Sequence, residues 1–199
     1  SRPSRFRRMA TALACFTLVL LGFGGWRFYV TPVSAISVDI NPSIELGVNR
    51  FDRIVSVTGY NEDGTDLAAS VELRNLNYSD ALDALLSSEE MQPYRENGGL
   101  VSITVIGSTE QKSEEMRVRI ASCGYASSRN VECQCGNRED VTAAHEAGLS
   151  FGKYRAFLEL QALDPDVSAE DVQSMTMRQI RDRINELSGS SNTTQYGSG

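Results

Sequence analysis

The chain has 199 residues, of which 41% are hydrophobic and 23% are charged, a composition that suits one folded domain with short additional segments and excludes a disordered chain. The formal net charge of −7 is unevenly divided, because residues 1–30 contain five arginines and no acidic residue, which leaves 14 basic and 26 acidic residues in the rest. That acidic excess argues against nucleic acid as a partner, since contacts with phosphates need clustered lysine and arginine side chains.

The first element is an uncharged, apolar run of 18 residues from Met9 to Trp26, at the short end of the range for a helix that spans a bilayer. Four arginines precede the run, and Phe28 and Tyr29 follow it, where interfacial aromatic residues are expected. The arginines place the N-terminus in the cytoplasm and the chain after about Thr31 outside it. The predicted order is a basic cytoplasmic end at residues 1–8, a transmembrane helix in contact with membrane lipid at residues 9–30, and an extracellular domain at residues 31–187.

A cleaved signal peptide is an alternative interpretation of this first segment. It would share the basic start and the apolar middle, and Val33-Ser34-Ala35 offers small residues for a cleavage site. Arg27 and the bulky aromatic residues before that site count against cleavage. Both interpretations place the domain that follows outside the cytoplasm.

Alternating side chains predict three strands in the first part of the outer domain. The first covers Ala35–Ile40 and is interrupted by Asn41-Pro42-Ser43. Extended stretches at residues 44–48 and 53–59 form a hairpin around the turn between them. Residues 61–64, Asn-Glu-Asp-Gly, are predicted as a loop.

Helices predominate in the second part. The apolar spacing of residues 78–86 predicts a helix with Asn77 and Asp80 as capping residues. Residues 101–105 alternate valine and isoleucine with serine and threonine, which predicts a half-buried strand. The remaining predicted elements are a helix after a capping box of Ser108 and Gln111, a short strand at 131–134, helices at 139–147, 153–162, 168–174 and 177–187, and a flexible linker at 188–199. Together they predict an α+β fold: an N-terminal transmembrane helix followed by an extracellular α/β sandwich with a small, mostly antiparallel sheet and several helices.

The pair Asn41-Pro42 carries the chemistry of interest. The side-chain nitrogen of an asparagine can attack its own backbone carbonyl carbon, form a succinimide and expel the next residue as a free amine. In most sequences the N–H of the next residue attacks the side chain first and causes deamidation, but proline has no N–H. Slow chain cleavage is therefore the reaction left at this bond, and a fold could accelerate it.

Acceleration requires an aligned nitrogen, hydrogen-bond donors for the developing oxyanion, and a route for the proton. Asp39 and Ser43 are the nearest polar side chains, and Asp39 would share a face with Asn41 if both lay on one strand. By itself an Asn-Pro pair is typical of a turn or a strand bulge. The surrounding sequence therefore has to decide between the chemical and the structural interpretation.

The surrounding sequence resembles a known family. The segment ISVDINPSIELGVN, from Ile36 to Asn49, and its continuation to Gly64 closely resemble the juxtamembrane segment of RsgI-type anti-sigma factors. A second stretch, AGLSFGKY at residues 147–154, fits the same family together with Leu163-Asp164-Pro165 and the closing helices. The resemblance covers about residues 9–187, and its first motif is the more specific one.

The resemblance implies a function. Such proteins hold an alternative sigma factor with a cytoplasmic domain, and their juxtamembrane domain cuts itself once in cis rather than acting as a turnover enzyme. Mapped here, the cut falls between Asn41 and Pro42. Asp39 and Ser43 remain the candidate helpers from their position in the sequence, and no cofactor is expected. The two halves stay associated until a signal separates them and exposes the stub to an intramembrane protease. The sigma-binding domain and a sensor module are not recognisable in this sequence.

Other motifs carry little chemistry. A disulfide from Cys123 to Cys133 or Cys135 is chemically allowed outside the cytoplasm, and the sequence leaves the pairing open. Zinc is not predicted, because C-x-C is not the usual ligand spacing and only His145 could add an imidazole. Residues 148–152 match G-x-S-x-G but lack a preceding strand and a later histidine, so their serine is predicted to cap a helix.

The sequence therefore predicts a self-cleaving, membrane-anchored signalling segment of an anti-sigma factor. The alternative is an uncleaved, membrane-anchored extracellular module that binds a partner or serves a structural role. The state of one peptide bond distinguishes the two.

Overall fold

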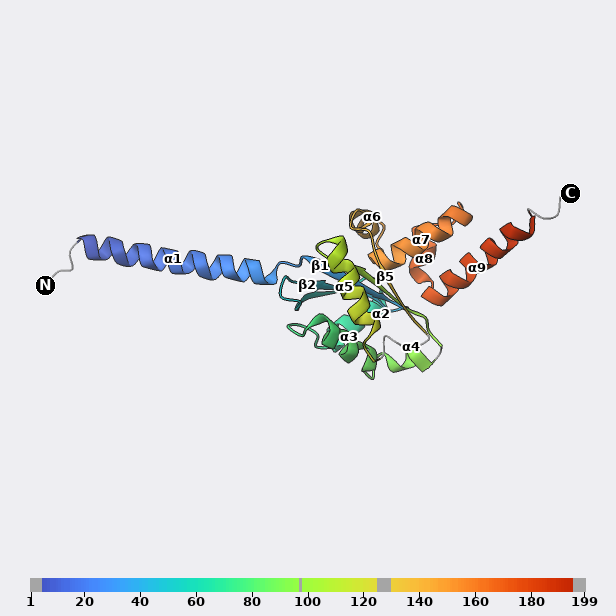
Figure 1. Ribbon diagram of the computed structural model, residues 1–199, viewed down its shortest axis with the longest axis horizontal. Coiled ribbons are helices and arrows are strands. Elements are labelled where there is room, and N and C mark those ends of the chain that lie inside the picture. Colours follow the sequence, from blue (N-terminus) through green and yellow to red (C-terminus); the bar gives the residue numbers. More distant parts are fainter. Residues whose placement is uncertain (1–4, 97, 125–129, 195–199) are drawn as a thin grey trace.

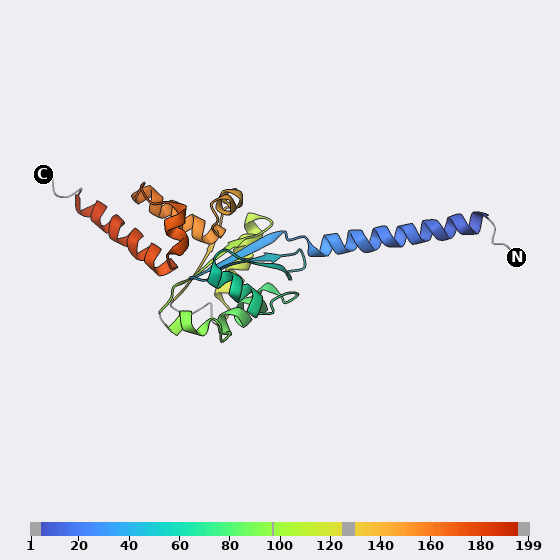
Figure 2. The ribbon, with the colours of Figure 1, turned by 180° about the vertical axis from the view of Figure 1, so that it is seen from behind.

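The computed structural model describes residues 5–96, 98–124 and 130–194. Helix α1 (Arg5–Val30) extends away from the folded domain, and α9 (Met177–Thr194) leaves the domain on the opposite side (Figures 1 and 2). In the described part of the chain, α1 is the one helix long and apolar enough to cross a membrane, and none of its 18-residue apolar window from Leu13 to Val30 is buried. The predicted transmembrane segment is therefore a helix without buried residues along this window, and it contacts the domain only near its C-terminal end, at Phe28 and Tyr29.

A five-stranded sheet forms the centre of the domain, in the order β3-β2-β1-β4-β5. All neighbouring strands are antiparallel except β4 and β5, which are parallel. The strands are β1 (Ser34–Asp39), β2 (Ser43–Val48), β3 (Ile54–Gly59), β4 (Val101–Ile106) and β5 (Val131–Cys135). The predicted α+β class and the mostly antiparallel sheet are thus confirmed.

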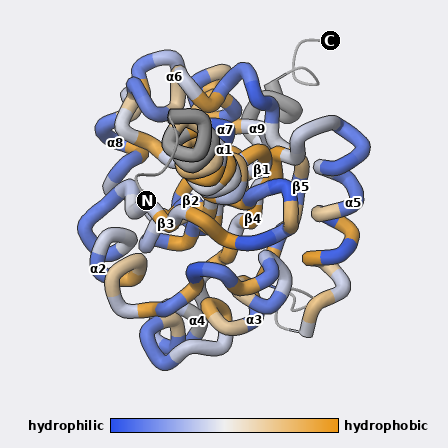
Figure 3. Tube along the Cα trace, turned by 90° about the vertical axis from the view of Figure 1, so that its left-hand side faces the viewer, coloured by the Kyte–Doolittle hydropathy of each residue, from blue (hydrophilic) through white to orange (hydrophobic). Residues whose placement is uncertain are grey.

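Helices cover both faces of the sheet (Figure 1). The remaining helices are α2 (Glu62–Ser70), α3 (Tyr78–Ser87), α4 (Gln92–Glu96), α5 (Glu110–Ala121), α6 (Asp140–Glu146), α7 (Phe151–Leu163) and α8 (Ala169–Ser174). One face carries the main hydrophobic core, in which strand residues such as Ile36 and Ile103 pack with Leu82 of α3 and Met116 of α5. Figure 3 shows the hydrophobic residues concentrated on α1 and on the central strands.

The second face is polar and is nevertheless buried. Ser37 of β1 lies opposite Glu45 of β2 and Thr104 of β4, and Asp39 of β1 lies opposite Ser43 and Ser102 in the same way. All six side chains belong to buried residues. The N-terminal part of α7 covers them, and it continues into a second, smaller core that α7, α8 and α9 share.

Burial of this second face corrects the prediction of a half-buried strand at residues 101–105. All six residues of β4 are buried. The alternation of apolar and polar residues correctly separates the two faces, but α7 occupies the side that the pattern assigns to solvent. Four of the six polar side chains find hydrogen-bond partners there, whereas the hydroxyls of Ser43 and Ser102 have none among the described residues.

Helix α2 lies where a loop is predicted, and one helix cap and one helix end also differ from the prediction. Residues 62–64 are the first turn of α2 rather than a loop, with Asn61 as its N-cap. Helix α5 is capped by Thr109, whose hydroxyl accepts a hydrogen bond from the Lys112 N–H, and not by Ser108. Helix α9 continues to Thr194, so the predicted linker is helical over residues 188–194. The same polar residues occur at helix caps and in loops. A cap is distinguished only by the hydrogen bond that its side chain accepts from a backbone N–H of the helix.

Candidate functional site

Asn41 lies in the three-residue turn that joins β1 to β2. The strands pair up to Asp39 and Ser43, and the Ile40 N–H donates to the carbonyl oxygen of Pro42 across the turn at 2.9 Å. Asn41 has a φ of 137°, a backbone conformation that residues other than glycine rarely adopt. A non-glycine residue held there stores strain of about 1–3 kcal/mol, which persists only because the surrounding structure enforces it.

The start of α2 provides one part of that enforcement through Asn61. The Asn61 side-chain nitrogen donates to Asn41 Oδ1 at 2.6 Å. The Asn61 side-chain oxygen accepts from the backbone N–H of Ser43 at 3.0 Å and from that of Gly64 at 2.8 Å. Asn61 therefore binds the residues on both sides of Pro42. It binds the side-chain oxygen of Asn41 and leaves the side-chain nitrogen of Asn41 available for attack.

Two further backbone contacts hold the turn. The carbonyl oxygen of Ile40 accepts from the N–H of Met177, the first residue of α9, at 2.9 Å. The carbonyl oxygen of Ser43 accepts from the Tyr60 N–H, also at 2.9 Å. The turn is thus attached to α9 before the Asn41-Pro42 bond and to the end of β3 after it.

Solvent reaches one side of this turn. Asn41 is half-buried, while Pro42 and Ser43 are buried. An open cavity of about 590 Å³ borders Asn41, and its wall is lined by Asn41, Asn61, Glu62, Asp63, Glu170, Gln173 and Ser174. Water and mobile proton carriers therefore have access to the side chain of Asn41.

Asp39 lies at the end of β1, and its carboxylate is directed toward α7. Its Oδ1 accepts from the Ser150 hydroxyl at 2.5 Å, and its Oδ2 accepts from the Ser37 hydroxyl. Burial raises the pKa of Asp39, and the hydroxyls of Ser150, Ser37 and Ser43 oppose that shift. The strand ends at Asp39 and Asn41 has a turn conformation, so the condition for a shared strand face is not met.

Lys153 is a buried lysine above the same carboxylate. Only 2% of its surface is exposed, and its ammonium group donates to the carbonyl oxygen of Gln173 at 2.9 Å. Burial lowers the pKa of Lys153 to about 8, and the charge of Asp39 opposes this shift. The Lys153 N–H also donates to the Ser150 hydroxyl at 3.2 Å, so the Ser-x-Gly-Lys segment caps α7 and binds Asp39 with one serine.

Gly152 permits this close approach of α7 to the sheet. A Cβ atom added to it would collide with Asp39 Oδ2, and it would lie 2.9 Å from Ser37 Oγ and 3.0 Å from Thr104 Oγ1. Glycine is therefore required here by space rather than by backbone conformation. The prediction that the serine of the G-x-S-x-G match caps a helix is confirmed.

Ser43 and Ser102 flank Asp39 on the neighbouring strands. Both hydroxyls are buried, and neither has a partner in hydrogen-bond geometry among the described residues, although Ser43 is near enough to Asp39 to lower the pKa of that carboxyl. Ser43 thus lies one residue after Pro42 with an uncommitted hydroxyl.

A second polar cluster joins β2 to α6 and α7. Glu45 accepts from the Phe151 N–H at 2.8 Å, and its other oxygen lies 3.0 Å from His145 Nε2. Burial raises the pKa of Glu45, and the Phe151 N–H and His145 oppose that shift. Burial and the neighbouring Glu45 raise the pKa of Tyr60, whose ring stacks on His145 at 5.2 Å. Glu45 therefore joins both helices to β2, α6 through His145 and α7 through the Phe151 N–H.

The structure brings Asn41, Pro42 and Ser43 together with Asn61 on one side of the turn and places Asp39 on the α7 side. Sequence reasoning did not identify Asn61 or Lys153 as part of this region. The signals available were an asparagine ahead of a helical first turn and a lysine three residues after a capping serine.

Within the described residues, no group of three or more histidine, cysteine or acidic side chains could hold a metal ion. Cys123, Cys133 and Cys135 of the domain that follows α1 are free thiols.

Comparison with known proteins supports the resemblance. Residues 33–159 match the family model described as the anti-sigma factor RsgI-like central domain. The chain is similar to the anti-sigma-I factors RsgI5 and RsgI7 of Acetivibrio thermocellus, at 25% identity (86% of this chain, 40% of the relative) and 24% identity (94% and 36%). It is also similar to anti-sigma-I factor RsgI of Bacillus anthracis, at 25% identity over 77% of this chain and 36% of the relative. The chain thus spans less than half the length of these relatives.

Proposed function

The chain belongs to the family of anti-sigma factors with an RsgI-like central domain, and on this premise we propose that it is a membrane-anchored signalling segment that cuts its own backbone between Asn41 and Pro42. One observation carries the proposal. Asn41 is held at a φ of 137° directly before a proline, with its amide oxygen bound to Asn61. Nothing in a purely structural turn requires this combination of strain, proline and a bound amide.

The reaction proceeds within one residue. The side-chain nitrogen of Asn41 attacks its own carbonyl carbon, the bond to the Pro42 nitrogen breaks, and a proton lost by the amide nitrogen ends on the proline nitrogen. The products are a fragment ending in a succinimide and a fragment beginning at Pro42, and water then opens the succinimide. Proline suppresses deamidation because it lacks an N–H.

The surrounding residues act by positioning. Asn61 fixes the Asn41 amide plane through its oxygen and leaves the nitrogen free to attack, and such alignment accounts for large rate effects in intramolecular reactions. Cleavage releases the backbone strain at Asn41. Asp39 fixes the end of β1 to α7, and the residue after Pro42, Ser43, has a buried hydroxyl without a partner in hydrogen-bond geometry among the described residues. Proton exchange with water takes place through the open cavity beside Asn41.

The cut serves signalling rather than turnover. In the proposed arrangement α1 crosses the membrane with the arginine-rich end in the cytoplasm, and the domain after Val30 lies outside. A signal that separates the cut halves exposes the short membrane stub to an intramembrane protease. That second cut releases the alternative sigma factor bound by a cytoplasmic domain of the parent protein.

The test is the intact mass of the full chain, purified in detergent and measured under denaturing conditions. We expect two fragments, the larger beginning at Pro42, and a single chain for Asn41→Ala. Pro42→Ala is the matched variant, because it restores an N–H and should divert Asn41 into deamidation, with little cleavage and the small mass increase of an amide converted to an acid.

A single uncut wild-type chain after long incubation at neutral pH would refute self-cleavage. The protein would then be an uncleaved, membrane-anchored extracellular module in which Asn41-Pro42 only shapes the turn. Equal cleavage of the wild type and Asn41→Ala would point instead to a contaminating protease.

A further inference from the structure

The turn between β2 and β3 lies against the end of α1. The ring of Phe51, at the tip of this turn, is centred 6.1 Å from that of Phe28 and 6.0 Å from that of Tyr29. The side-chain nitrogen of Asn49 donates to the carbonyl oxygen of Tyr29 at 2.9 Å. The last turn of the apolar helix and the tip of a hairpin far along the chain thus form one aromatic cluster.

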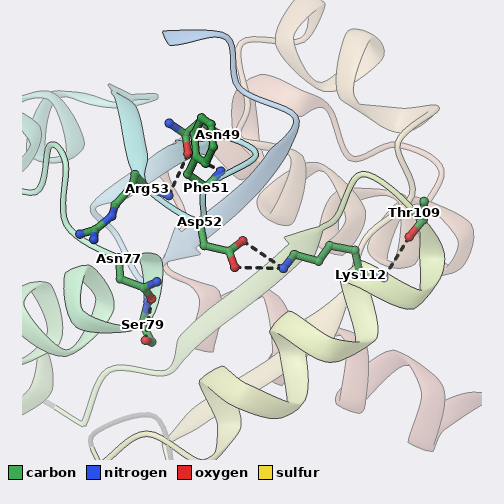
Figure 4. A network of polar contacts seen from close by, with 8 residues as sticks. All are labelled: Asn49, Phe51, Asp52, Arg53, Asn77, Ser79, Thr109 and Lys112. Carbon is green, nitrogen blue, oxygen red and sulfur yellow. Dashed lines mark hydrogen bonds and ion pairs between the residues drawn. The ribbon is translucent and has the colours of Figure 1, made fainter. Parts of the chain in front are cut away.

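The tip is held rigidly in this position. The Asn49 side-chain oxygen accepts from the N–H of Phe51 at 2.9 Å and from that of Arg53 at 3.0 Å, which closes the turn on itself (Figure 4). The Tyr29 hydroxyl donates to Asn75 Oδ1 at 3.1 Å and so fixes the helix end to the domain. The depth of Phe51 relative to α1 is therefore set by the fold.

The aromatic cluster is exposed although it is apolar. Phe51 is 55% exposed and Phe28 is 48% exposed, so each ring keeps about half of its surface uncovered. The guanidinium group of Arg50 lies 3.4 Å from the centre of the Phe28 ring, in cation–π geometry. Apolar rings combined with arginine at the end of a membrane helix are typical of the interface between water and lipid.

Geometry limits where Phe51 lies when α1 spans a bilayer. The window Leu13–Val30 covers about 27 Å of helix, close to the roughly 30 Å of a bilayer's hydrocarbon core. Phe28, in the last turn of that window, then lies at the edge of the hydrocarbon. The centres of the Phe51 and Phe28 rings are 6.1 Å apart. Whatever the tilt of α1, the Phe51 ring therefore lies at most that far from the edge of the hydrocarbon, within a headgroup layer of about 5–8 Å.

The charge of the tip suits the same surroundings. Arg50 and Arg53 lie on either side of Phe51-Asp52. The one carboxylate of the tip, Asp52, forms an ion pair with Lys112 at 3.0 Å (Figure 4). The tip therefore presents an excess of positive charge, which attracts lipid phosphates.

We propose that the Arg50-Phe51 tip is a membrane-surface anchor, with the Phe51 ring at the boundary between headgroups and acyl chains and the arginines at the phosphates. The inference rests on the proposed membrane span of α1. Its consequence concerns the cut protein, because Phe51 belongs to the fragment that begins at Pro42. That fragment would keep its own attachment to the bilayer after cleavage.

The experiment uses the full chain reconstituted in phosphatidylcholine vesicles whose acyl chains are brominated near the headgroup, which quenches nearby indoles. Trp26 is the only tryptophan, and its quenching in the unaltered chain reports whether α1 is inserted. The anchor is tested with Phe51→Trp in a Trp26→Phe background. Leu163→Trp in the same background is the control, because Leu163 is exposed at the end of α7 farthest from α1 (Figure 1).

We expect the indole of Phe51→Trp to be quenched nearly as strongly as Trp26 and several times more strongly than that of Leu163→Trp. If Trp26 is quenched and the indole at position 51 is not, the anchor is refuted while the span stands. The tip would then be covered by water or by a second copy of the chain instead of lipid. If Trp26 itself is not quenched, the span is refuted and the anchor with it.

Discussion

At the scale of single residues, the turn between β1 and β2 combines a strained backbone with a hydrogen-bond network that holds it in place. Asn41 adopts a positive φ, and its side chain enters a network that a glycine there could not form. The network centres on Asn61, which binds Asn41 with its donor and the N–H groups of Ser43 and Gly64 with its acceptor. The two functions of Asn61, capping α2 and holding Asn41, can therefore be separated.

Asn61→Asp separates them. Aspartate keeps the acceptor oxygen and is as good an N-cap as asparagine, but it has no donor for Asn41 Oδ1. We expect the first-order rate of chain cleavage to fall about 100-fold, the scale of effect expected for a small misplacement of reacting groups. The thermal unfolding midpoint should change little, and both quantities can be followed on one sample by mass spectrometry and circular dichroism.

The matched control is Asn77→Asp. Asn77 caps α3 through its side-chain oxygen in the same way, and it does not contact the turn that contains Asn41. This variant should cleave at the wild-type rate. Equal rates for Asn61→Asp and Asn77→Asp would show that the bond to Asn41 does not contribute to cleavage.

At the scale of elements, the packing of α7 on the polar face of the sheet distinguishes this domain from a sandwich with a single apolar core. Ser150 serves both as N-cap of α7 and as hydrogen-bond donor to Asp39 of β1. Lys153, one turn further on, is bound to the carbonyl oxygen of Gln173 in α8. The helix is thus docked by hydrogen bonds as well as by apolar contacts, and these bonds satisfy strand side chains that would otherwise be buried without partners.

Gly152→Ala should weaken this docking. The added methyl group would overlap Asp39 Oδ2 and crowd Ser37 and Thr104, so α7 has to move away from the sheet. We expect the free energy of unfolding to fall by about 1–3 kcal/mol, the usual cost of overpacking, as measured by denaturant unfolding.

Gly25→Ala provides the comparison, because a Cβ atom at that position of α1 meets no other atom within 4 Å. It should leave the unfolding midpoint of the domain that follows α1 unchanged. Equal midpoints for the two variants would show that α7 is not held as tightly against β1 as the distances indicate.

At the scale of the whole molecule, the position of β1 explains how a cut chain can remain one body. The smaller fragment would contain α1 and β1, and β1 lies between β2 and β4 in the middle of the sheet. Both edges of β1 are paired, and its Ile36 and Val38 are buried in the main core. None of these contacts depends on the bond between Asn41 and Pro42.

We therefore expect the two fragments of the cleaved chain to co-elute from a gel-filtration column in mild detergent. They should separate when the same sample is run in concentrated guanidinium chloride, which disrupts the strand pairing and the core. Asn41→Ala should run as a single species in both conditions. Elution of the larger fragment alone without denaturant would show that pairing of β1 is insufficient to hold the halves together.

Local sequence patterns were sufficient to identify several features. The uncharged run from Met9 to Trp26 lies within α1, and alternating side chains predicted the strands that surround Asn41. The Asn77 cap is as predicted, and the helix predicted at 168–174 is α8, which begins with a capping box of Ser168 and Asp171. These features depend on residues within a few positions of each other, where periodicity, run length and capping chemistry act directly.

Only the tertiary structure decided the surroundings of the Asn41-Pro42 bond. Asn61 meets Asn41 because α2 begins beside the turn, and Asp39 is buried because α7, more than 100 positions later, covers it. Sequence patterns assign a polar strand face to solvent and a polar run to a loop. Both assignments are correct when no other segment of the chain supplies hydrogen-bond partners for these polar groups. Which buried groups find partners depends on packing between distant segments, and that information is not contained in any local pattern.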